Sequence, residues 1–129
     1  MHEVAETMSP NLVSVGADVT LCDAAKLMNE RHIGAVLVLD GGRLDGILTE
    51  RDVLRAVAAG RVEGSSVADW MTRRPETIEP SDSTTHAAML MTHGGFRHLP
   101  VVEGESVVGM LSIRDVVRVV IQDEAPRGV

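Results

Sequence analysis

The sequence has one cysteine, few aromatic residues and one lysine, and each shortage excludes a class of protein. Because Cys22 is the only cysteine, neither an internal disulfide nor a cysteine-based metal site can form within the chain, and nothing indicates an oxidising compartment. Trp70 and Phe96 are the only aromatic residues, so the core must be aliphatic. Lys26 is the only lysine and the net charge is −7, which makes nucleic acid an unfavourable partner.

Long hydrophobic runs are also missing. The longest one, AVLVL, is far shorter than the ~20 residues that a membrane-spanning helix needs. The beginning of the chain, MHEVAETMSP, lacks the basic start and apolar stretch of a targeting segment. We therefore expect a cytoplasmic protein with no membrane partner.

What the sequence does contain is an internal repeat with an offset of 63 residues. GILTERDVLRAV, which starts at Gly46, returns as GMLSIRDVVRVV from Gly109. A repeat of this size is barely able to bury a core alone, so we expect the two halves to depend on each other. The organisation that follows is repeat 1 at residues 1–60, a connector at 61–66, repeat 2 at 67–121 and a polar tail at 122–129.

Each repeat shows a β-α-β-β-α pattern after a short helical start. The first strand is expected at LVSV in repeat 1 and at ETIE in repeat 2. The alanine-rich helix that follows has a typical N-cap residue, Thr20 in repeat 1 and Ser83 in repeat 2. Two strands joined by a glycine-containing turn come next, AVLVL with LDGIL and HLPVV with VVGML. A last helix begins at Thr49 or Ser112. The predicted fold class is α/β (α+β), with two tandem repeats.

The last helix of each repeat carries more apolar surface than one buried face needs. In DVLRAVAA and DVVRVVIQ, mainly Arg55 and Arg118 interrupt the apolar residues. A second apolar face exposed on a monomer requires a partner, and a two-fold dimer is the simplest arrangement. We therefore expect a homodimer.

A glycine, a hydroxyl and an aspartate recur at the spacing G-x-x-[ST]-x-x-D. A helix N-terminus is a natural seat for phosphate, and the hydroxyl can add a donor. The aspartate can accept two hydrogen bonds from a ribose diol, and the glycine would let a flat ring approach the backbone. This spacing therefore predicts a nucleoside site in each repeat. The two sets are Gly46, Thr49 and Asp52 in repeat 1, and Gly109, Ser112 and Asp115 in repeat 2.

The same residues also have purely structural interpretations. A hydroxyl followed three residues later by an acidic residue is typical of a capping box at the start of a helix. A strand glycine can mark a bulge or tight packing. The sequence leaves these alternatives open.

The duplicated GILTERD and GMLSIRD, the DAAKLM and HAAMLM helices and the segment FRHLPVV resemble a tandem pair of CBS domains, a Bateman module, over residues 4–121. The resemblance implies two repeats packed about a pseudo-two-fold axis, with clefts for AMP, ADP, ATP or S-adenosylmethionine. It also implies a regulatory protein that is not an enzyme and has no obligatory cofactor.

The resemblance further implies roles for single residues. Asp52 and Asp115 would hold ribose, and Thr49 and Ser112 would lie near the phosphate or ribose. Backbone at 13–15 and at 77–79 would flank the base.

Arg97 and His98 fall where the family often places phosphate-binding side chains. They align with Gly34 and Ala35 in repeat 1. We therefore expect unequal sites, in which only repeat 2 has a positively charged side chain for phosphate. Outside the family resemblance, Arg97 can equally be a surface ion-pair partner and His98 a packed strand residue.

The expected function is a cytoplasmic sensor of an adenosine ligand that acts on an unknown effector protein. The alternative is a ligand-free CBS scaffold or inhibitor that works through protein contacts. No catalytic residues are predicted, since Cys22 has no evident base. His86 and His93 share one helix face, but no accompanying histidine and carboxylate pattern supports a metal site.

Overall fold

The computed structural model describes residues 2–124 and divides the chain into two compact units. We call Val13–Pro75 the first-repeat unit. The second-repeat unit is the chain up to Leu12 together with the described residues from Glu76 onward. The units do not coincide with the sequence repeats, because the beginning of each repeat is built into the unit formed by the other.

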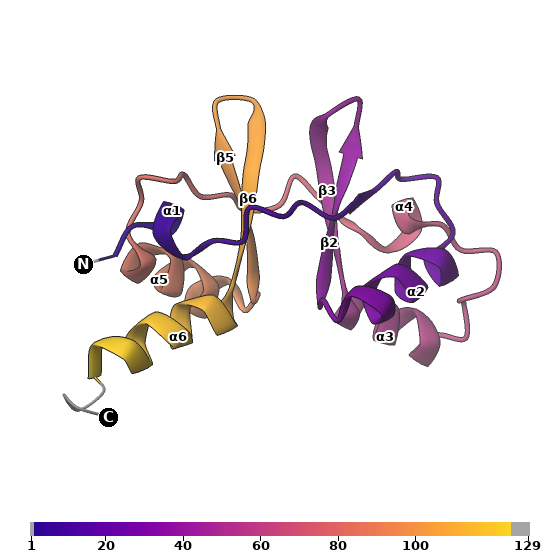
Figure 1. Ribbon diagram of the computed structural model, residues 1–129. Coiled ribbons are helices and arrows are strands. Elements are labelled where there is room, and N and C mark those ends of the chain that lie inside the picture. The colour runs from indigo at the N-terminus through magenta and orange to yellow at the C-terminus, as the bar shows by residue number, and fades with distance from the viewer. Residues whose placement is uncertain (1, 125–129) are drawn as a thin grey trace. The chain divides into compact units, whose positions relative to one another are not determined.

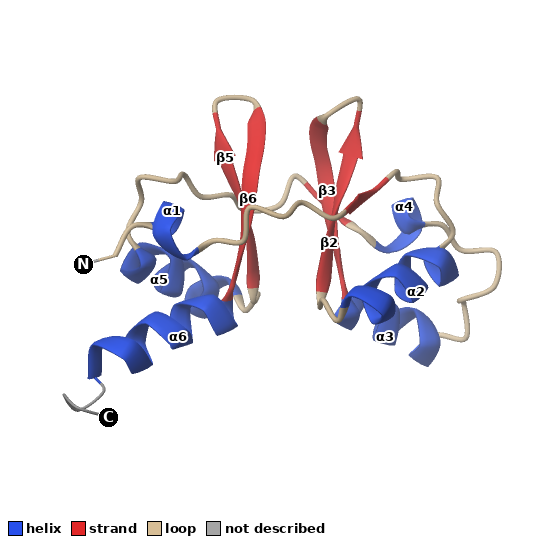
Figure 2. Ribbon diagram, in the orientation of Figure 1, coloured by secondary structure: helices blue, strands red, loops and turns tan. Residues whose placement is uncertain are grey.

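The first-repeat unit is a small mixed sheet with helices. Its strand order is β1-β2-β3-β4, with β1 parallel to β2 and the other pairs antiparallel. Figure 2 shows the β2–β3 hairpin of this sheet in red and the helices of the unit in blue. The strand β4 was not predicted. It comes from the start of repeat 2, which supplies an edge strand to repeat 1. The elements are β1 (Ser14–Val15), α2 (Leu21–Arg31), β2 (Ala35–Asp40), β3 (Arg43–Thr49), α3 (Glu50–Ala58), α4 (Val67–Trp70) and β4 (Thr72–Arg73).

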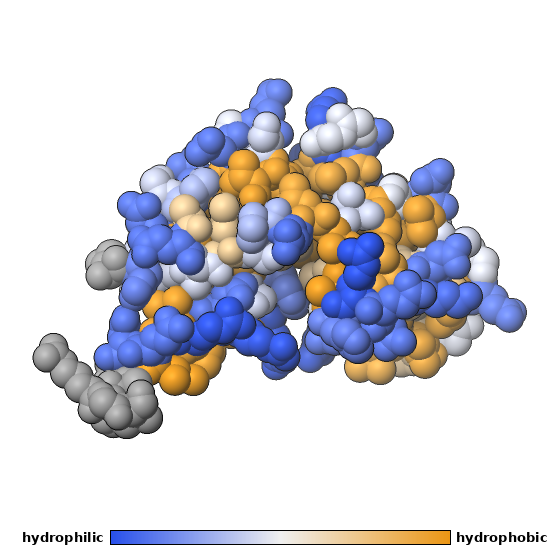
Figure 3. Space-filling view, viewed as in Figure 1, coloured by the Kyte–Doolittle hydropathy of each residue, from blue (hydrophilic) through white to orange (hydrophobic). Residues whose placement is uncertain are grey.

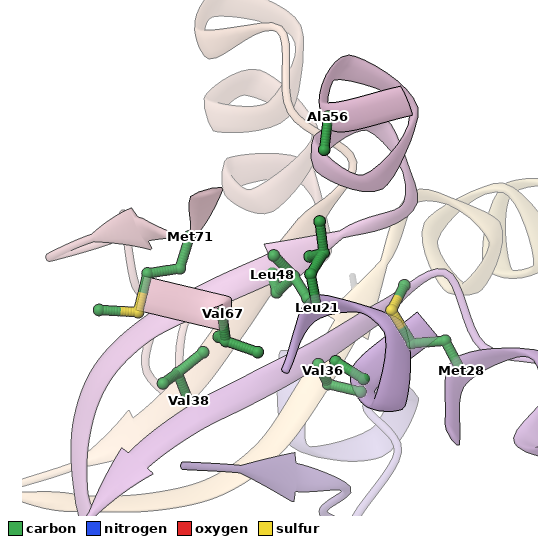
Figure 4. Packing of buried hydrophobic residues seen from close by; sticks show 9 residues of the cluster. Leu21, Met28, Val36, Val38, Leu48, Ala56, Val67 and Met71 are labelled. Carbon is green, nitrogen blue, oxygen red and sulfur yellow. The ribbon is translucent and has the colours of Figure 1, made fainter. Parts of the chain in front are cut away.

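An aliphatic core holds this unit together, as the scarcity of aromatic residues requires. The helix α2 starts where predicted, because the Thr20 hydroxyl accepts a hydrogen bond from the Asp23 amide at 3.1 Å. Apolar side chains from α2, β2, β3, α3 and α4 meet in one cluster (Figure 4). Its buried members are Leu21, Ala24, Met28, Val36, Val38, Leu48, Ala56, Val67 and Met71.

The second-repeat unit has the same plan with less regular edges. The segment ETIE forms only a single parallel bridge, between Ile78 and Val101, where a strand was predicted. A single antiparallel bridge between Ser9 and Met110 lies on the other side of the hairpin. The elements are α1 (Val4–Thr7), α5 (Thr84–Gly94), β5 (His98–Glu103), β6 (Ser106–Ser112) and α6 (Ile113–Glu124), so α6 extends into the expected tail, of which residues 125–129 lie outside the described part.

The N-terminal helix α1 belongs to the core of the second-repeat unit. Figure 1 shows it, in indigo, beside α5 and α6. Val4 is completely buried in a cluster that includes Leu99 and Val101. His2 adds a polar link, because its Nε2 lies 3.0 Å from Oδ1 of Asp123 on α6, and this hydrogen bond raises the pKa of the imidazole. The first residues of repeat 1 are thus structural parts of the other unit.

Both last helices expose an apolar face, as predicted. Leu54 on α3 is 63% exposed and Ile121 on α6 is 62% exposed. Val57, Val117 and Val120 are exposed as well. In Figure 3, hydrophobic surface is visible on each unit among hydrophilic side chains. The sequence repeat has therefore placed an equivalent apolar face on each unit.

Candidate functional site

The hydroxyl and aspartate of each repeat form a capping box at the junction between a strand and its following helix. In repeat 1, Oδ2 of Asp52 accepts hydrogen bonds from the amide of Thr49 at 2.9 Å and from its hydroxyl at 3.1 Å. The Asp52 amide in turn donates to the Thr49 hydroxyl at 3.4 Å. Ser112 and Asp115 repeat this pattern at 2.9, 3.0 and 3.2 Å. The structural alternative considered for these pairs is therefore present in both repeats.

The capping box does not use the whole carboxylate. An ionised carboxylate offers about four lone-pair positions. The capping bonds lead only to Oδ2, in Asp52 as in Asp115. The side chains of Asp52 and Asp115 are 8% and 15% exposed, respectively, so each oriented carboxylate retains some access to solvent. Oδ1 of each aspartate therefore takes no part in the capping box.

An arginine one helical turn further on contacts Oδ1 in both repeats. Nη1 of Arg55 lies 3.2 Å from Asp52 Oδ1, and Nη1 of Arg118 lies 3.4 Å from Asp115 Oδ1. Both arginine side chains are exposed, and an ion pair of this kind contributes at most about 1 kcal/mol to stability. Sequence reasoning noted these arginines only as polar interruptions. The D-x-x-R spacing, shared by both repeats, was the signal that could have identified the pair.

The two strand glycines are explained by close packing within their units. A Cβ atom added to Gly46 would lie 2.5 Å from the carbonyl oxygen of Thr72, and one added to Gly109 would lie 2.9 Å from that of Ser9. The side chains of Met71 and Met8 fill the remaining space. The tight-packing interpretation therefore accounts for both glycines, because neither position has room for a Cβ atom.

In the second-repeat unit, four predicted site residues come together at one end of the β5–β6 hairpin. His98 lies opposite Ser112 in the antiparallel register. The carbonyl of the exposed Arg97 accepts a hydrogen bond from the Ile113 amide at 2.9 Å, which fixes the backbone of Arg97 beside the start of α6. Asp115 is held by Ser112 in the same turn. The backbone of Arg97 and His98 thus lies beside the helix N-terminus at which the Ser112 hydroxyl and the Asp115 carboxylate are hydrogen-bonded.

The first-repeat unit has the same backbone arrangement with fewer polar side chains. Ala35 lies opposite Thr49, and the Glu50 amide donates to the carbonyl of Gly34 at 2.9 Å. The difference between the units is therefore one of side chains, because Gly34 and Ala35 stand where Arg97 and His98 stand in the other unit.

The backbone segments expected to flank a base lie beside the first hairpin strand in each unit. Ile78 donates to the Pro100 carbonyl at 3.1 Å and accepts from the Val102 amide at 2.8 Å. The Leu37 amide donates to the Val13 carbonyl at 3.1 Å. The segment 77–79 is thus fixed to β5, and the segment 13–15 is fixed to β2.

A surface pocket of about 260 Å³ lies next to Glu79 in the second-repeat unit. Glu3, Glu79 and Glu103 are among the residues that line it. Three carboxylates disfavour a phosphate by like-charge repulsion. The acidic lining therefore makes this pocket unfavourable for a phosphorylated ligand.

The histidines of α5 lie outside any metal-binding cluster of the described residues. His86 and His93 are both exposed on α5. Between residues 2 and 124, no group of three or more histidine, cysteine or acidic side chains is arranged to hold a metal ion. Over the same residues, every helix is too short or too polar to cross a membrane.

Comparison with protein families identifies the chain. The CBS domain family matches residues 3–59 and 67–122. The chain therefore belongs to the CBS domain family and carries two CBS domains in tandem, which confirms the resemblance in the sequence.

Three curated relatives are similar over most of this chain. They are an uncharacterized 17.7 kDa protein of Acidianus ambivalens (35% identity, 90% of this chain and 71% of the relative), the CBS domain-containing protein YhcV of Bacillus subtilis (34%, 89% and 83%) and the mitochondrial CBS domain-containing protein CBSX3 of Arabidopsis thaliana (40%, 82% and 55%). The chain thus spans only about half the length of CBSX3.

Solved structures of CBS proteins share this fold. A protein with CBS domains from Burkholderia ambifaria MC40-6 matches with a TM-score of 0.91 at 37% identity, over 99% of this chain and 100% of that chain. CBSX2 in complex with AMP matches with 0.85 at 26% identity, over 96% and 99%. The CBS domain pair of MJ0100 in complex with 5′-methylthioadenosine and S-adenosyl-L-methionine matches with 0.86 at 25% identity, over 92% and 99%. These matches confirm the predicted mixed α/β fold with tandem CBS repeats.

Proposed function

We propose that this protein is a regulatory module that binds an adenosine-containing ligand, namely AMP, ADP, ATP or S-adenosylmethionine. The observation that carries the proposal is the grouping of Arg97, His98, Ser112 and Asp115 at the N-terminus of α6. CBS pairs of similar structure are found in complex with AMP and with S-adenosyl-L-methionine. The protein acts without catalysis, as a cytoplasmic sensor whose output passes to an effector protein.

The two repeats take different ligands, or the same ligand with different affinities. In repeat 2, Asp115 accepts hydrogen bonds from ribose while Arg97 pairs with phosphate. In repeat 1, Asp52 offers the same carboxylate, but Gly34 and Ala35 provide no cation. A phosphorylated ligand therefore occupies the repeat 2 site first.

Thermal unfolding in the presence of AMP, ADP, ATP or S-adenosylmethionine tests the proposal. At a concentration of 100 times its Kd, the preferred ligand stabilises the wild-type protein by about 2.7 kcal/mol. Asp115→Ala removes most of this stabilisation and Asp52→Ala removes less, since the repeat 1 site lacks the positively charged side chain for phosphate. Each variant is compared with its own ligand-free unfolding temperature, because loss of the capping box alone costs about 1 kcal/mol.

A ligand-free scaffold or inhibitor is the second candidate, and the exposed apolar faces of α3 and α6 favour it. A folded, monodisperse wild-type protein that none of the four ligands stabilises would exclude the sensor and favour this candidate.

We also propose that the exposed faces of α3 and α6 form a homodimer interface. Val120→Asp places a charge on the apolar face of α6, and we expect sedimentation velocity to show a monomer at concentrations where the wild type is a dimer. Gln122→Asp is the matched control, because it adds the same charge at an exposed polar position of α6. A monomeric wild type, or a Val120→Asp variant that still dimerises, would contradict the dimer.

A further inference from the structure

Trp70, the only tryptophan, lies in a cationic environment at the end of α4. The guanidinium carbon of Arg55 is 5.7 Å from its ring centroid, and that of Arg61 is 5.6 Å away. Both distances are within the ~6 Å range of cation–π attraction. The indole Nε1 donates to the Ser65 hydroxyl at 3.1 Å, and this hydroxyl donates to the Arg61 carbonyl. Trp70 is therefore held in place by α3 and by the loop that follows it.

Arg55 makes a second contact, and that contact leads to the candidate site. Its Nη1 lies 3.2 Å from Asp52 Oδ1, so one guanidinium lies both beside the site carboxylate and over the Trp70 ring. The second-repeat unit has only the first half of this connection. Arg118 contacts Asp115 at 3.4 Å, but the residue equivalent to Trp70 is Thr7.

Counting hydrogen bonds shows what a ligand would displace. Of about four lone-pair positions on a carboxylate, those of Asp52 already accept from the Thr49 amide, the Thr49 hydroxyl and Arg55. One position is left, whereas a ribose diol that donates two hydrogen bonds needs two. The Thr49 amide is fixed by the helix start, and the Arg55 side chain is 61% exposed and free to turn outward. Arg55 is therefore the donor that a ribose diol would displace from Asp52.

We propose that Arg55 is a positioning residue that couples ligand binding at Asp52 to the docking of Trp70 and α4. When a diol replaces Arg55 on Asp52, the guanidinium moves from its place over the indole ring. The helix α4 leads into β4, and the chain leaves the first-repeat unit at Pro75. Occupancy of the repeat 1 site thus acts on one of the two segments that connect the units. The ligand-dependent part of this coupling rests on the proposed function.

The Asp52 to Trp70 connection is tested first without ligand, by the fluorescence of the single tryptophan. We expect Asp52→Asn to shift the Trp70 emission when Arg55 is present and to cause no shift in an Arg55→Gln background. Circular dichroism establishes that each variant is folded. The matched control is Asp115→Asn, which removes the equivalent carboxylate next to Arg118 and leaves Trp70 emission unchanged. Emission that is insensitive to Asp52→Asn, or equally sensitive with and without Arg55, would overturn the coupling.

The ligand step is tested by titrating AMP into Asp115→Asn, in which the repeat 1 site is intact, by calorimetry and by Trp70 emission in parallel. We expect an emission change that follows the calorimetric occupancy and is lost in Asp115→Asn/Arg55→Gln. Binding heat without an emission change would overturn the coupling and leave the proposed function intact, and it would point to the Thr49 hydroxyl as the displaced donor. Absence of AMP binding to both Asp115→Asn and the wild type counts against AMP as the ligand in the proposed function, while the ligand-free experiment still decides whether Arg55 connects Asp52 to Trp70.

Discussion

Replacing Val4 with aspartate is expected to unfold the second-repeat unit, although Val4 belongs to repeat 1 in the sequence. Val4 is 0% exposed and packs in the cluster of Leu99, Val101 and Leu111. An unpaired carboxylate in such a place costs several kcal/mol, which is a large share of the ~5–15 kcal/mol by which a domain is stable. Hydrogen exchange will show loss of protection in β5, β6 and α5, with a much smaller effect in β2, β3 and α2.

Val67→Asp is the matched variant, because Val67 holds the equivalent position and is buried in the first-repeat unit. Here we expect β2, β3 and α2 to lose protection first. If instead Val4→Asp first exposed the amides of residues 13–60, each repeat would hold its own short helix and the division into units would be incorrect.

Replacing Arg97 with glutamine is expected to weaken the binding of AMP about tenfold or more and to leave the binding of adenosine unchanged. A hydrogen bond to a charged group contributes about 1.5–3 kcal/mol, and each 1.4 kcal/mol corresponds to a factor of ten in Kd. Because adenosine has no phosphate, it does not use the guanidinium. Calorimetric titration of both ligands into both proteins measures the difference.

Arg43→Gln controls for the general loss of one positive charge, since Arg43 is exposed and lies in the first-repeat unit. It should bind AMP as the wild type does. Equal weakening of AMP and adenosine by Arg97→Gln, or equal weakening of AMP by both variants, would remove Arg97 from phosphate recognition.

The local structure could be predicted from the sequence because it depends on residues close to one another in the chain. Thr20 and Ser83 cap their helices through the amide three residues later, as expected from the sequence. The alternation of turns and apolar runs predicted both hairpins. The strand expected at ETIE is reduced to a bridge at Ile78, since strand pairing depends on a neighbour that local pattern does not specify.

The exchange of short helices between the units could not be predicted from the repeat. Val4 and Val67 are equivalent in sequence, so each unit contains the same set of elements whether it keeps its own short helix or takes the other one. The periodic pattern is identical in the two cases. The close contacts at Gly46 and Gly109 depend on the same exchange, because the atoms that approach them belong to the exchanged segments around Thr72 and Ser9.

The candidate site was predicted in part. The spacing indicated a shared turn for Ser112 and Asp115, and the structure adds that His98 lies opposite Ser112. The contact of Arg55 with Trp70 joins two segments whose distance in space no local pattern specifies.

The most direct test of the proposed function is a calorimetric titration of AMP, ADP, ATP and S-adenosylmethionine into the wild-type protein and into the double variant Asp52→Asn/Asp115→Asn. Asparagine keeps the size of the side chain, removes its negative charge and replaces one of the two acceptor oxygens with an NH2 donor. We predict saturable binding of at least one ligand to the wild type, with that binding lost in the double variant. Unchanged binding in the folded double variant, or no binding of any of the four ligands to the wild type, would contradict a nucleoside site built on these two aspartates.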